Sequence, residues 1–427
     1  MTNFATIDKS KSLSAVLKVV GVGGGGCNAI ESMIRRGLTG VEYVAVNTDA
    51  QVLESNSAHH KLQVGVKITK GLGAGADPNV GRKAVEEDKE RIAEILTGSD
   101  MVFVTTGMGG GTGTGGTPVV ASIAKSLGSL VIGVVTKPFQ WEGKQRMLNA
   151  ENGIQELKKY VDSLIIIPNE RLLSIVDKNT SFHTAFDTPN EVLYEATRGI
   201  ADIITVEGLI NVDFADVRAV MNQSGVAMMG CGIASGENRA IEAAQKAISS
   251  PLLDGVKIKG AKSVLLNVTG SSNLTLHEVI EGNRVISEAA GEEANVIFGC
   301  VKNEELKDYV SYTVIATGFD DPKKSYSTPP PTQKKAELPK ETRMKSGFLF
   351  NSRDDIDTNN LDEPTILRVR KPDVKLQKDD DSSIQPGFGF DRLKNFTIDD
   401  NKEKEEVTND YQDNDEESSS FLRMMMD

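Results

Sequence analysis

Residues 107–116 read Gly-Met-Gly-Gly-Gly-Thr-Gly-Thr-Gly-Gly, and the interpretation of the whole chain starts from them. They follow an apolar run at 101–104 and precede a stretch with helical periodicity at 119–127. A glycine costs backbone entropy and adds no side chain, so we expect so many glycines to serve a ligand and not packing. Where a strand meets a helix, a ligand that backbone N–H groups approach closely is most simply a phosphate chain. A flexible surface loop would lack such flanks.

Two more glycine-rich turns lie earlier in the sequence. An apolar strand at 16–20 runs into Gly-Val-Gly-Gly-Gly-Gly at 21–26, with a helix expected over 29–36. Residues 71–78 read Gly-Leu-Gly-Ala-Gly-Ala-Asp-Pro, and one amphipathic helix is expected over 79–96. We place each of the three turns between a strand and a helix. Because such loops meet at one edge of a parallel sheet, they are predicted to converge on one polyphosphate.

The pattern of apolar segments predicts two domains joined by a long helix. Strands alternate with helices over 15–188, which indicates an α/β fold with a doubly wound parallel sheet. The long helix is expected over 189–210, with Thr188 as its N-cap and Pro189 as its first residue. Residues 211–319 are expected to form a smaller α/β domain. Its expected helices are 239–248 and 276–289, and its expected strands are 263–269, 295–300 and 312–316.

The composition excludes several classes of protein. A formal net charge of −13 disfavours direct binding to nucleic acid, whose phosphates attract basic surfaces. Cys27, Cys231 and Cys300 lie too far apart in sequence for a disulfide framework, and the histidines show no metal-ligand spacing with them. No run approaches the ~20 apolar residues of a membrane span, and 1–14 lacks a signal-peptide core. We therefore expect a cytoplasmic protein with no metal site of its own, no direct membrane insertion and a flexible segment at 1–14.

The first glycine turn alone leaves a second interpretation open. Gly21, Gly23 and Gly26 fit the Gly-x-Gly-x-x-Gly fingerprint of dinucleotide-binding proteins. A strand at 41–46 ends near Asp49, about where a ribose-binding acid would stand. The alternative is an oxidoreductase that depends on NAD. A single fingerprint is weak evidence, however, and the longer glycine loop at 107–116 is foreign to that fold.

Gly-Gly-Gly-Thr-Gly-Thr-Gly at 109–115 resembles the signature loop of the tubulin superfamily, and its flanks are similar to the FtsZ family of bacterial cell-division GTPases. The resemblance extends over about 17–319. It implies GTP as the substrate, Mg²⁺ as its counter-ion, hydrolysis to GDP and phosphate, and head-to-tail polymerisation. The Asn-Lys-x-Asp and Gly-x-x-x-x-Gly-Lys-Ser/Thr motifs of the other GTPase class are absent. The expected phosphate-binding residues are Gly24, Gly25, Gly26, Cys27, Asn28, Gly73, Ala74, Gly75, Gly109, Gly110, Gly111, Thr112, Gly113, Thr114 and Gly115.

Four residues are candidates for holding the rest of the nucleotide. Glu142 and Arg146 are four apart, which equally fits a surface ion pair on one helix; the resemblance implies that they contact ribose and phosphate. Phe186 could stack on a base. Asn190 offers both a donor and an acceptor to a guanine edge, and the resemblance of this stretch to the family supports that role.

Asn211, Asp213 and Asp216 form a further candidate group, in Asn-Val-Asp-Phe-Ala-Asp. A helix cap followed by an acid in the first turn would explain these carboxylates without any catalytic role. The resemblance implies instead that they polarise the water that attacks the γ-phosphate. The long helix would span about 30 Å, more than one nucleotide reaches. If both roles hold, the acids act on nucleotide of the next subunit, and such heterologous contacts build a filament.

After residue 319 the composition changes to proline and charge runs with few aliphatic residues, which predicts a disordered tail over 320–427. Residues 362–371 resemble the family's peptide that docks membrane tethers and regulatory division proteins, and 421–426 is a second candidate. The extension 372–427 departs from the family pattern. The resemblance implies a protein of the midcell division site. A related filament protein for cell shape or plasmid segregation is the alternative within the superfamily.

Overall fold

The computed structural model describes residues 15–173, 180–206, 208–253 and 258–319. The predicted flexible segment at 1–14 and the predicted tail at 320–427, with both candidate docking peptides, lie outside these residues. Within the described ranges, no helix has the length and apolar character needed to cross a membrane.

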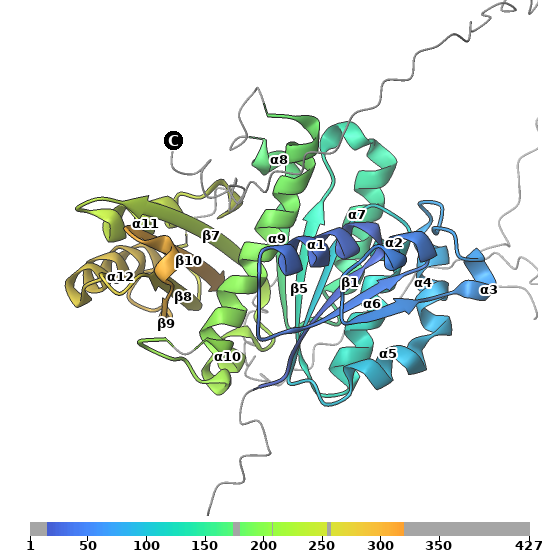
Figure 1. The fold of residues 1–427 in the computed structure, drawn as a ribbon, viewed down its shortest axis with the longest axis horizontal. Helices are drawn as coiled ribbons and strands as arrows, with labels where there is room; N and C mark the ends of the chain where they lie inside the picture. Colours follow the sequence, from blue (N-terminus) through green and yellow to red (C-terminus); the bar gives the residue numbers. More distant parts are fainter. Residues whose placement is uncertain (1–14, 174–179, 207, 254–257, 320–427) are drawn as a thin grey trace, which may run out of the picture. The chain divides into compact units, whose positions relative to one another are not determined.

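Six parallel strands form the sheet of the first domain (Figure 1), in the order β3-β2-β1-β4-β5-β6. The chain moves outward from β1 in one direction and from β4 in the other. A crevice therefore forms between the carboxyl ends of β1 and β4. The predicted doubly wound parallel sheet is confirmed. Its strands are β1 (Leu17–Val22), β2 (Glu42–Asn47), β3 (His60–Gln63), β4 (Met101–Gly107), β5 (Leu130–Lys137) and β6 (Ser163–Pro168).

Helices cover both faces of this sheet because successive side chains of each strand enter different cores. Val19 and Phe103 belong to the core completed by α1 (Gly23–Arg35) and α9 (Phe182–Thr205). Val20 and Val104 belong to the opposite core, completed by α4 (Pro78–Glu87), α5 (Lys89–Leu96), α6 (Thr112–Ser126) and α7 (Lys144–Leu157). The connections hold α2 (Ala50–Glu54), α3 (Val66–Thr69), η1 (Gln140–Glu142) and α8 (Asn169–Leu172).

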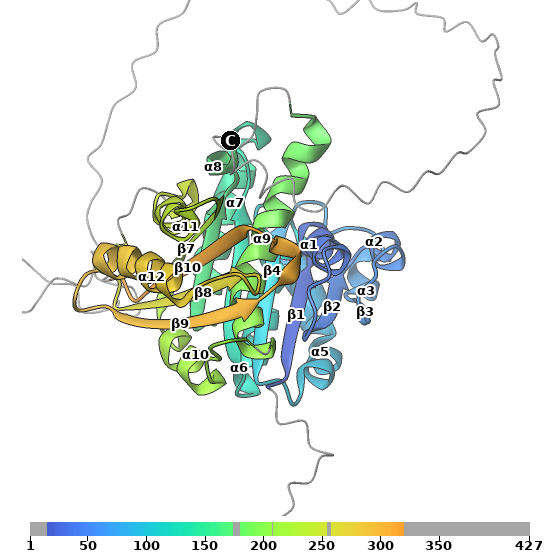
Figure 2. The same cartoon turned by 60° about the vertical axis from the view of Figure 1, so that its left-hand side comes forward.

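The second domain continues the same sheet (Figure 2). Strand β7 (Gly225–Ser235) pairs parallel with β6 through its first residues and then antiparallel with β10 (Tyr309–Thr317). Strands β8 (Ser263–Gly270) and β9 (Asn295–Lys302) complete the order β7-β10-β8-β9. Helices α11 (Arg239–Ile248) and α12 (Leu276–Ala290) pack on it, and α10 (Phe214–Met221), η2 (Pro251–Leu253) and η3 (Glu304–Leu306) lie in its connections. The prediction assigned no strand to β7.

The central helix differs from the predicted 189–210. Helix α9 begins at Phe182 after Ser181, whose hydroxyl accepts the N–H of Thr184 at 3.1 Å. Thr188 is therefore not the cap, and its hydroxyl donates to the Thr184 carbonyl at 3.0 Å inside the helix. Pro189 lies within the helix, where it removes one backbone donor without ending the helix. The helix ends at Thr205 because Val206 is extended.

The predicted helix over 79–96 is in fact two helices. Asp88 separates α4 from α5 with a non-helical backbone. Its carboxylate accepts the N–H of Gly65 at 2.9 Å and pairs with Arg91 at 2.9 Å. This side chain therefore ties the break to the loop that precedes α3.

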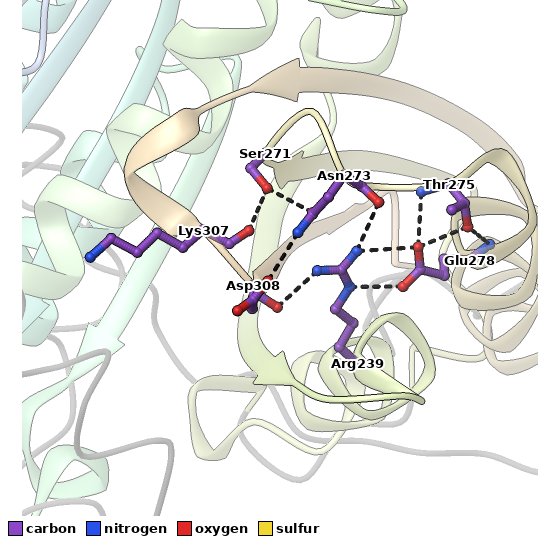
Figure 3. A network of polar contacts seen from close by, with 7 residues as sticks. All are labelled: Arg239, Ser271, Asn273, Thr275, Glu278, Lys307 and Asp308. Carbon is purple, nitrogen blue, oxygen red and sulfur yellow. Dashed lines mark hydrogen bonds and ion pairs between the residues drawn. The ribbon is translucent and has the colours of Figure 1, made fainter.

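A buried arginine holds the second domain together (Figure 3). The Arg239 guanidinium on α11 pairs with Glu278 of α12 at 2.7 Å and donates to the carbonyls of Asp308 (3.0 Å) and Asn273 (3.1 Å). Glu278 also accepts the N–H and hydroxyl of Thr275, each at 2.8 Å. The hydrogen bond from Arg239, with those from Thr275, lowers the pKa of Glu278 to about 2. One side chain therefore joins two helices and two loops.

Replacing this arginine is expected to destabilise the fold strongly. Arg239→Ala should lower the free energy of unfolding by roughly 3 kcal/mol, because it removes the positive partner of Glu278 and the donor to two carbonyls. Since the folded state lowers the pKa of Glu278, this difference should be complete above about pH 5 and shrink as the pH falls toward 2. Urea unfolding of the full chain measures both. The control is Arg284→Ala, whose exposed pair with Glu288 should contribute under ~0.5 kcal/mol; equal losses would contradict the prediction.

Candidate functional site

Two glycine-rich segments touch at the carboxyl ends of β1 and β4. A methyl group added to Gly23 would lie 2.7 Å from the backbone nitrogen of Gly113. One added to Gly25 would lie 3.0 Å from the nitrogen of Gly107. The backbones of the first and third predicted loops are thus in direct contact at the crevice of the sheet.

The second glycine-rich turn reaches the same place from the side. A methyl group added to Gly111 would lie 2.8 Å from Cβ of Ala74 and 3.0 Å from the nitrogen of Asp77. This turn follows helix α3, so the expectation that every glycine turn lies between a strand and a helix is wrong here. The three segments nevertheless lie side by side.

Several of the glycines serve packing, which corrects the expectation that they would not. Residues 23–26 form the start of α1, and 112–116 form the start of α6, ahead of the helices predicted from 29 and 119. A methyl group on Gly26 would lie 2.6 Å from the Thr105 carbonyl oxygen. One on Gly115 would lie 1.8 Å from the Pro78 carbonyl oxygen. These positions are glycine because two backbones meet there.

Four other glycines have open space in front of them. No atom lies within 4 Å of a methyl group added to Gly24, Gly73, Gly75 or Gly110. Gly75 has a positive φ of 61°, which favours glycine on its own. The other three need glycine neither for packing nor for a left-handed backbone. Close approach of a ligand to the backbone would account for glycine at these positions.

The helix ends at this place lack side-chain caps. No side chain caps α1 or α6, whereas Asp77 caps α4 by accepting the Asn79 N–H at 2.8 Å. The first N–H groups of a helix have no intrahelical acceptor and carry partial positive charge. Asn28 is exposed in the next turn of α1. Two adjacent helix N-termini without side-chain caps therefore favour the binding of an anion between them.

Three predicted side chains are buried and hold the loops in place. Cys27 is 1% exposed, and burial raises the pKa of its thiol to about 12, so only its backbone could contact a ligand. The Thr112 hydroxyl shares a 2.8 Å hydrogen bond with Thr48. The Thr114 hydroxyl accepts the Gly109 N–H at 2.8 Å. These contacts fix the shape of the signature segment.

The ion pair between Glu142 and Arg146 is present, with its oxygen and nitrogen 3.1 Å apart. The carboxylate also accepts the Phe139 N–H at 2.8 Å, which fixes the turn before α7. The Arg146 side chain lies against the signature segment, since a methyl group on Gly109 would be 2.7 Å from its Cγ. The structure therefore brings this pair to the glycine loops and also gives it a structural role.

An aromatic cluster stands beside this pair. Phe186 meets Phe139 and Trp141 edge to face, with ring centroids 5.6 and 5.8 Å away. Phe139 and Trp141 stack on each other at 5.5 Å. Trp141 is 59% exposed, and sequence reasoning missed it although it is the only tryptophan and adjoins Glu142.

Asn190 lies one turn after Phe186 on α9. Its side-chain N–H donates to Asp187 at 3.1 Å. Arg36, just after α1, contacts Asp187 at 3.8 Å and also pairs with Glu191. These charged residues, which the prediction did not include, fix the side of α9 that carries Asn190.

Asn211, Asp213 and Asp216 are exposed and hold a turn and a helix end. Asn211 accepts the Gly208 N–H at 2.7 Å. Asp213 caps α10 by accepting the Ala215 N–H at 3.1 Å. The simple explanation of a cap followed by a first-turn acid therefore applies to this structure.

These acids lie at the opposite edge of the sheet from the glycine loops. Arg218 of α10 donates to the Gly128 carbonyl at 3.2 Å, just before β5 begins. The other end of β5 pairs Thr136 with Gly107 of the signature segment. The eight residues of β5 span about 26 Å. Asp213 is therefore too far from the glycine loops of its own chain to share a nucleotide with them.

Two family models match the two domains of this chain. Residues 16–177 match the Tubulin/FtsZ family GTPase domain, and 225–320 match the FtsZ family C-terminal domain. An FtsZ dimer from M. jannaschii is 47% identical over 71% of this chain and 88% of that chain, with a TM-score of 0.69. A mutant FtsZ from M. jannaschii is 46% identical over 72% and 92% of the two chains, with the same TM-score.

A GTPγS-bound protofilament of CetZ2 from Haloferax volcanii shares the fold alone, at 19% identity over 71% of this chain and 93% of that chain, with a TM-score of 0.62. The oxidoreductase alternative is wrong, because the matched family is one of GTPases. The chain belongs to the FtsZ family, the filament-forming GTPases of cell division.

Proposed function

We propose that GTP lies across the carboxyl ends of β1 and β4, with its phosphates between the uncapped ends of α1 and α6. The open space before Gly24 and Gly110 carries this proposal, because neither packing nor backbone conformation requires glycine there. The turn with Gly73, Ala74 and Gly75 closes the phosphate site from the side. The anion would be held by backbone N–H groups and by the positive ends of two helices.

The remaining predicted residues fit the other parts of the nucleotide. Phe186 would stack on the base from the edge of its aromatic cluster. Asn190 would bind the guanine edge, with its orientation set by Asp187. Arg146 lies nearer the phosphates because it touches Gly109, and Glu142 would bind the ribose.

Mg²⁺ would accompany GTP. The described residues contain no group of His, Cys, Asp or Glu side chains suited to hold a metal ion by themselves. The ion would be bound mainly through phosphate and water oxygens, which is how Mg²⁺ is usually held beside a nucleotide. The ion would neutralise charge that develops on the phosphates.

We also propose that hydrolysis takes place between subunits. Asp213 and Asp216 lie at the amino edge of the sheet, one strand length from the phosphate site. They would orient and polarise the attacking water on GTP bound by the next subunit. Such a contact joins opposite ends of two molecules and propagates as a filament.

Residues 362–371 resemble the family's peptide that docks membrane tethers, and 421–426 are a second candidate. One of these segments would bind membrane tethers and regulatory division proteins. Such partners would bring the filament to the division site at midcell. The match to the FtsZ C-terminal domain favours division over the roles in cell shape or plasmid segregation.

A bulky side chain at Gly24 is expected to block GTP without disturbing the fold. Gly24→Leu should weaken GTP binding at least tenfold (about 1.4 kcal/mol) and leave the melting temperature of the nucleotide-free protein unchanged. The control is Gly26→Leu, where the same side chain meets the Thr105 carbonyl and should unfold the domain. Equilibrium binding of labelled GTP and thermal unfolding measure the two effects. Normal GTP affinity in folded Gly24→Leu would contradict the proposed phosphate site.

Two defective subunits are expected to restore each other's activity. Asp213→Asn keeps a good cap on α10 but removes the charge, so it should bind GTP and hydrolyse it about 100-fold more slowly. Gly24→Leu lacks the GTP site but retains both acids. A mixture should regain phosphate release, because GTP on the first variant meets the acids of the second.

The control for this experiment is each variant alone at the same total concentration. A mixture no faster than the two variants alone would contradict a site shared between subunits. So would full activity of the native chain at a dilution that prevents assembly.

A further inference from the structure

A cavity of about 440 Å³ lies in the first domain among α4, α5, α6 and α7, on the face of the sheet opposite α1 and α9. Residues of α6 form its floor, and residues of α4, the start of α5 and α7 line its sides. None of the residues proposed for the base, the ribose or the acids lines it. Its volume is that of a small-molecule site and far exceeds that of a single bound water.

The interior of the cavity suits a flat apolar group. Val119 and Ile123 of α6 are half-buried on its floor, and Tyr160 stands at its α7 side. The Tyr160 hydroxyl bonds to Glu156 at 3.5 Å, so its polar end is engaged while its ring borders the cavity. An aromatic ligand could pack against both the aliphatic floor and this ring.

The charged side chains at the rim favour a negatively charged ligand. Arg82 is paired with Glu86 at 2.8 Å, and Glu156 is paired with Lys159. Lys89 also lines the cavity and has no ion pair with any residue in the described part of the chain. The charge left without a partner at the rim is therefore positive.

We propose that this cavity is a binding site for a small aromatic anion. The ring would lie on Val119 and Ile123 beside Tyr160, and the carboxylate, sulfonate or phosphate group would pair with Lys89. Ser122, one turn from Val119 on the same floor, would lie beneath the ring.

The walls of the cavity are continuous with the loops at the carboxyl edge of the sheet. Pro78 and Gly115 line it, and these are the residues at which the backbones of α4 and α6 meet. Thr114 also lines it, and its hydroxyl holds the Gly109 N–H. An occupant that separates α4 from α6 changes the spacing of both loops. By linkage, ligand and guanine nucleotide then change each other's affinity by the same factor.

The probe for the test is 8-anilinonaphthalene-1-sulfonate, an aromatic anion that fluoresces in apolar sites. It is titrated into the full-length chain, and its affinity for the cavity is compared between variants. Ser122→Phe fills the floor and should remove one saturable site or weaken it at least tenfold (about 1.4 kcal/mol). Ser126→Phe, one turn further on α6 and outside the cavity, should have no effect.

A second pair of variants tests the charge independently of packing. Lys89→Ala should weaken binding about threefold, and Lys83→Ala, exposed on α4 outside the cavity, should leave it unchanged. The proposal is overturned if neither Ser122→Phe nor Lys89→Ala weakens binding, or if the control variants weaken it equally. An unchanged affinity for GDP at saturating probe would overturn the linkage to the nucleotide. These measurements record the binding of the probe and of GDP and not GTP hydrolysis. Their outcome is therefore independent of the test of the GTPase site shared between subunits.

Discussion

Backbone contact between three helices is the constraint on which the nucleotide site depends. Methyl groups would lie 2.3 Å from the Gly111 carbonyl oxygen if added to Gly81, and 2.7 Å from the backbone nitrogen of Gly113 if added to Gly23. Only glycine allows α1, α4 and α6 to come so close beside β1 and β4. As a result, the uncapped N-termini of α1 and α6 and the turn at 73–75 lie together at the carboxyl ends of β1 and β4. Backbone dipoles give this place partial positive charge, and Arg146, whose side chain lies against Gly109, adds a full positive charge beside it.

This arrangement weakens the isolated fold and makes the ligand part of its stability. Each glycine inside a helix lowers the stability of the folded chain by about 1 kcal/mol relative to alanine. A helix end without a side-chain cap lacks about 1 kcal/mol of further stabilisation. The apolar cores on both faces of the sheet compensate within the chain. A nucleotide that binds only the folded chain adds about 2.7 kcal/mol when its concentration is 100 times its dissociation constant.

The sequence allowed the convergence of the loops to be predicted, but not where the helices begin. Convergence of the first and third loops follows from parallel strands, whose carboxyl ends share an edge. The second turn follows α3, and the strand argument does not account for its place. Helix starts were placed too late, at 29 and 119, because glycine is a poor helix former and tertiary packing overrides that preference at 23–26 and 112–116. Pro189 likewise suggested a first residue, although Ser181 supplies the cap.

Strand β7 was missed for a related reason. Its glycines break the apolar run, yet methyl groups on Gly230 and Gly232 would lie 2.1 Å from carbonyl oxygens of α11. That contact is with residues further along the chain, and no local pattern encodes it. Trp141 was missed because it acquires its place only when η1 and α9 come together. Asp187 was missed because its charged partner, Arg36, comes from the distant segment that follows α1.

The direction of the sheet gives the molecule its polarity. All strands from β3 to β6 run the same way, so every carboxyl end lies at the glycine loops, while Gly128 marks the amino end of β5 beside α10. The separation of the two ends is set by hydrogen-bonded strands and by α9, neither of which shortens without breaking backbone bonds. In the proposed mechanism, the phosphate site and the acids lie at opposite ends of the chain, so bending could not bring them together. Stacking of subunits would bring them together, and because the two ends differ, each added subunit would present a new unpaired end of the same kind.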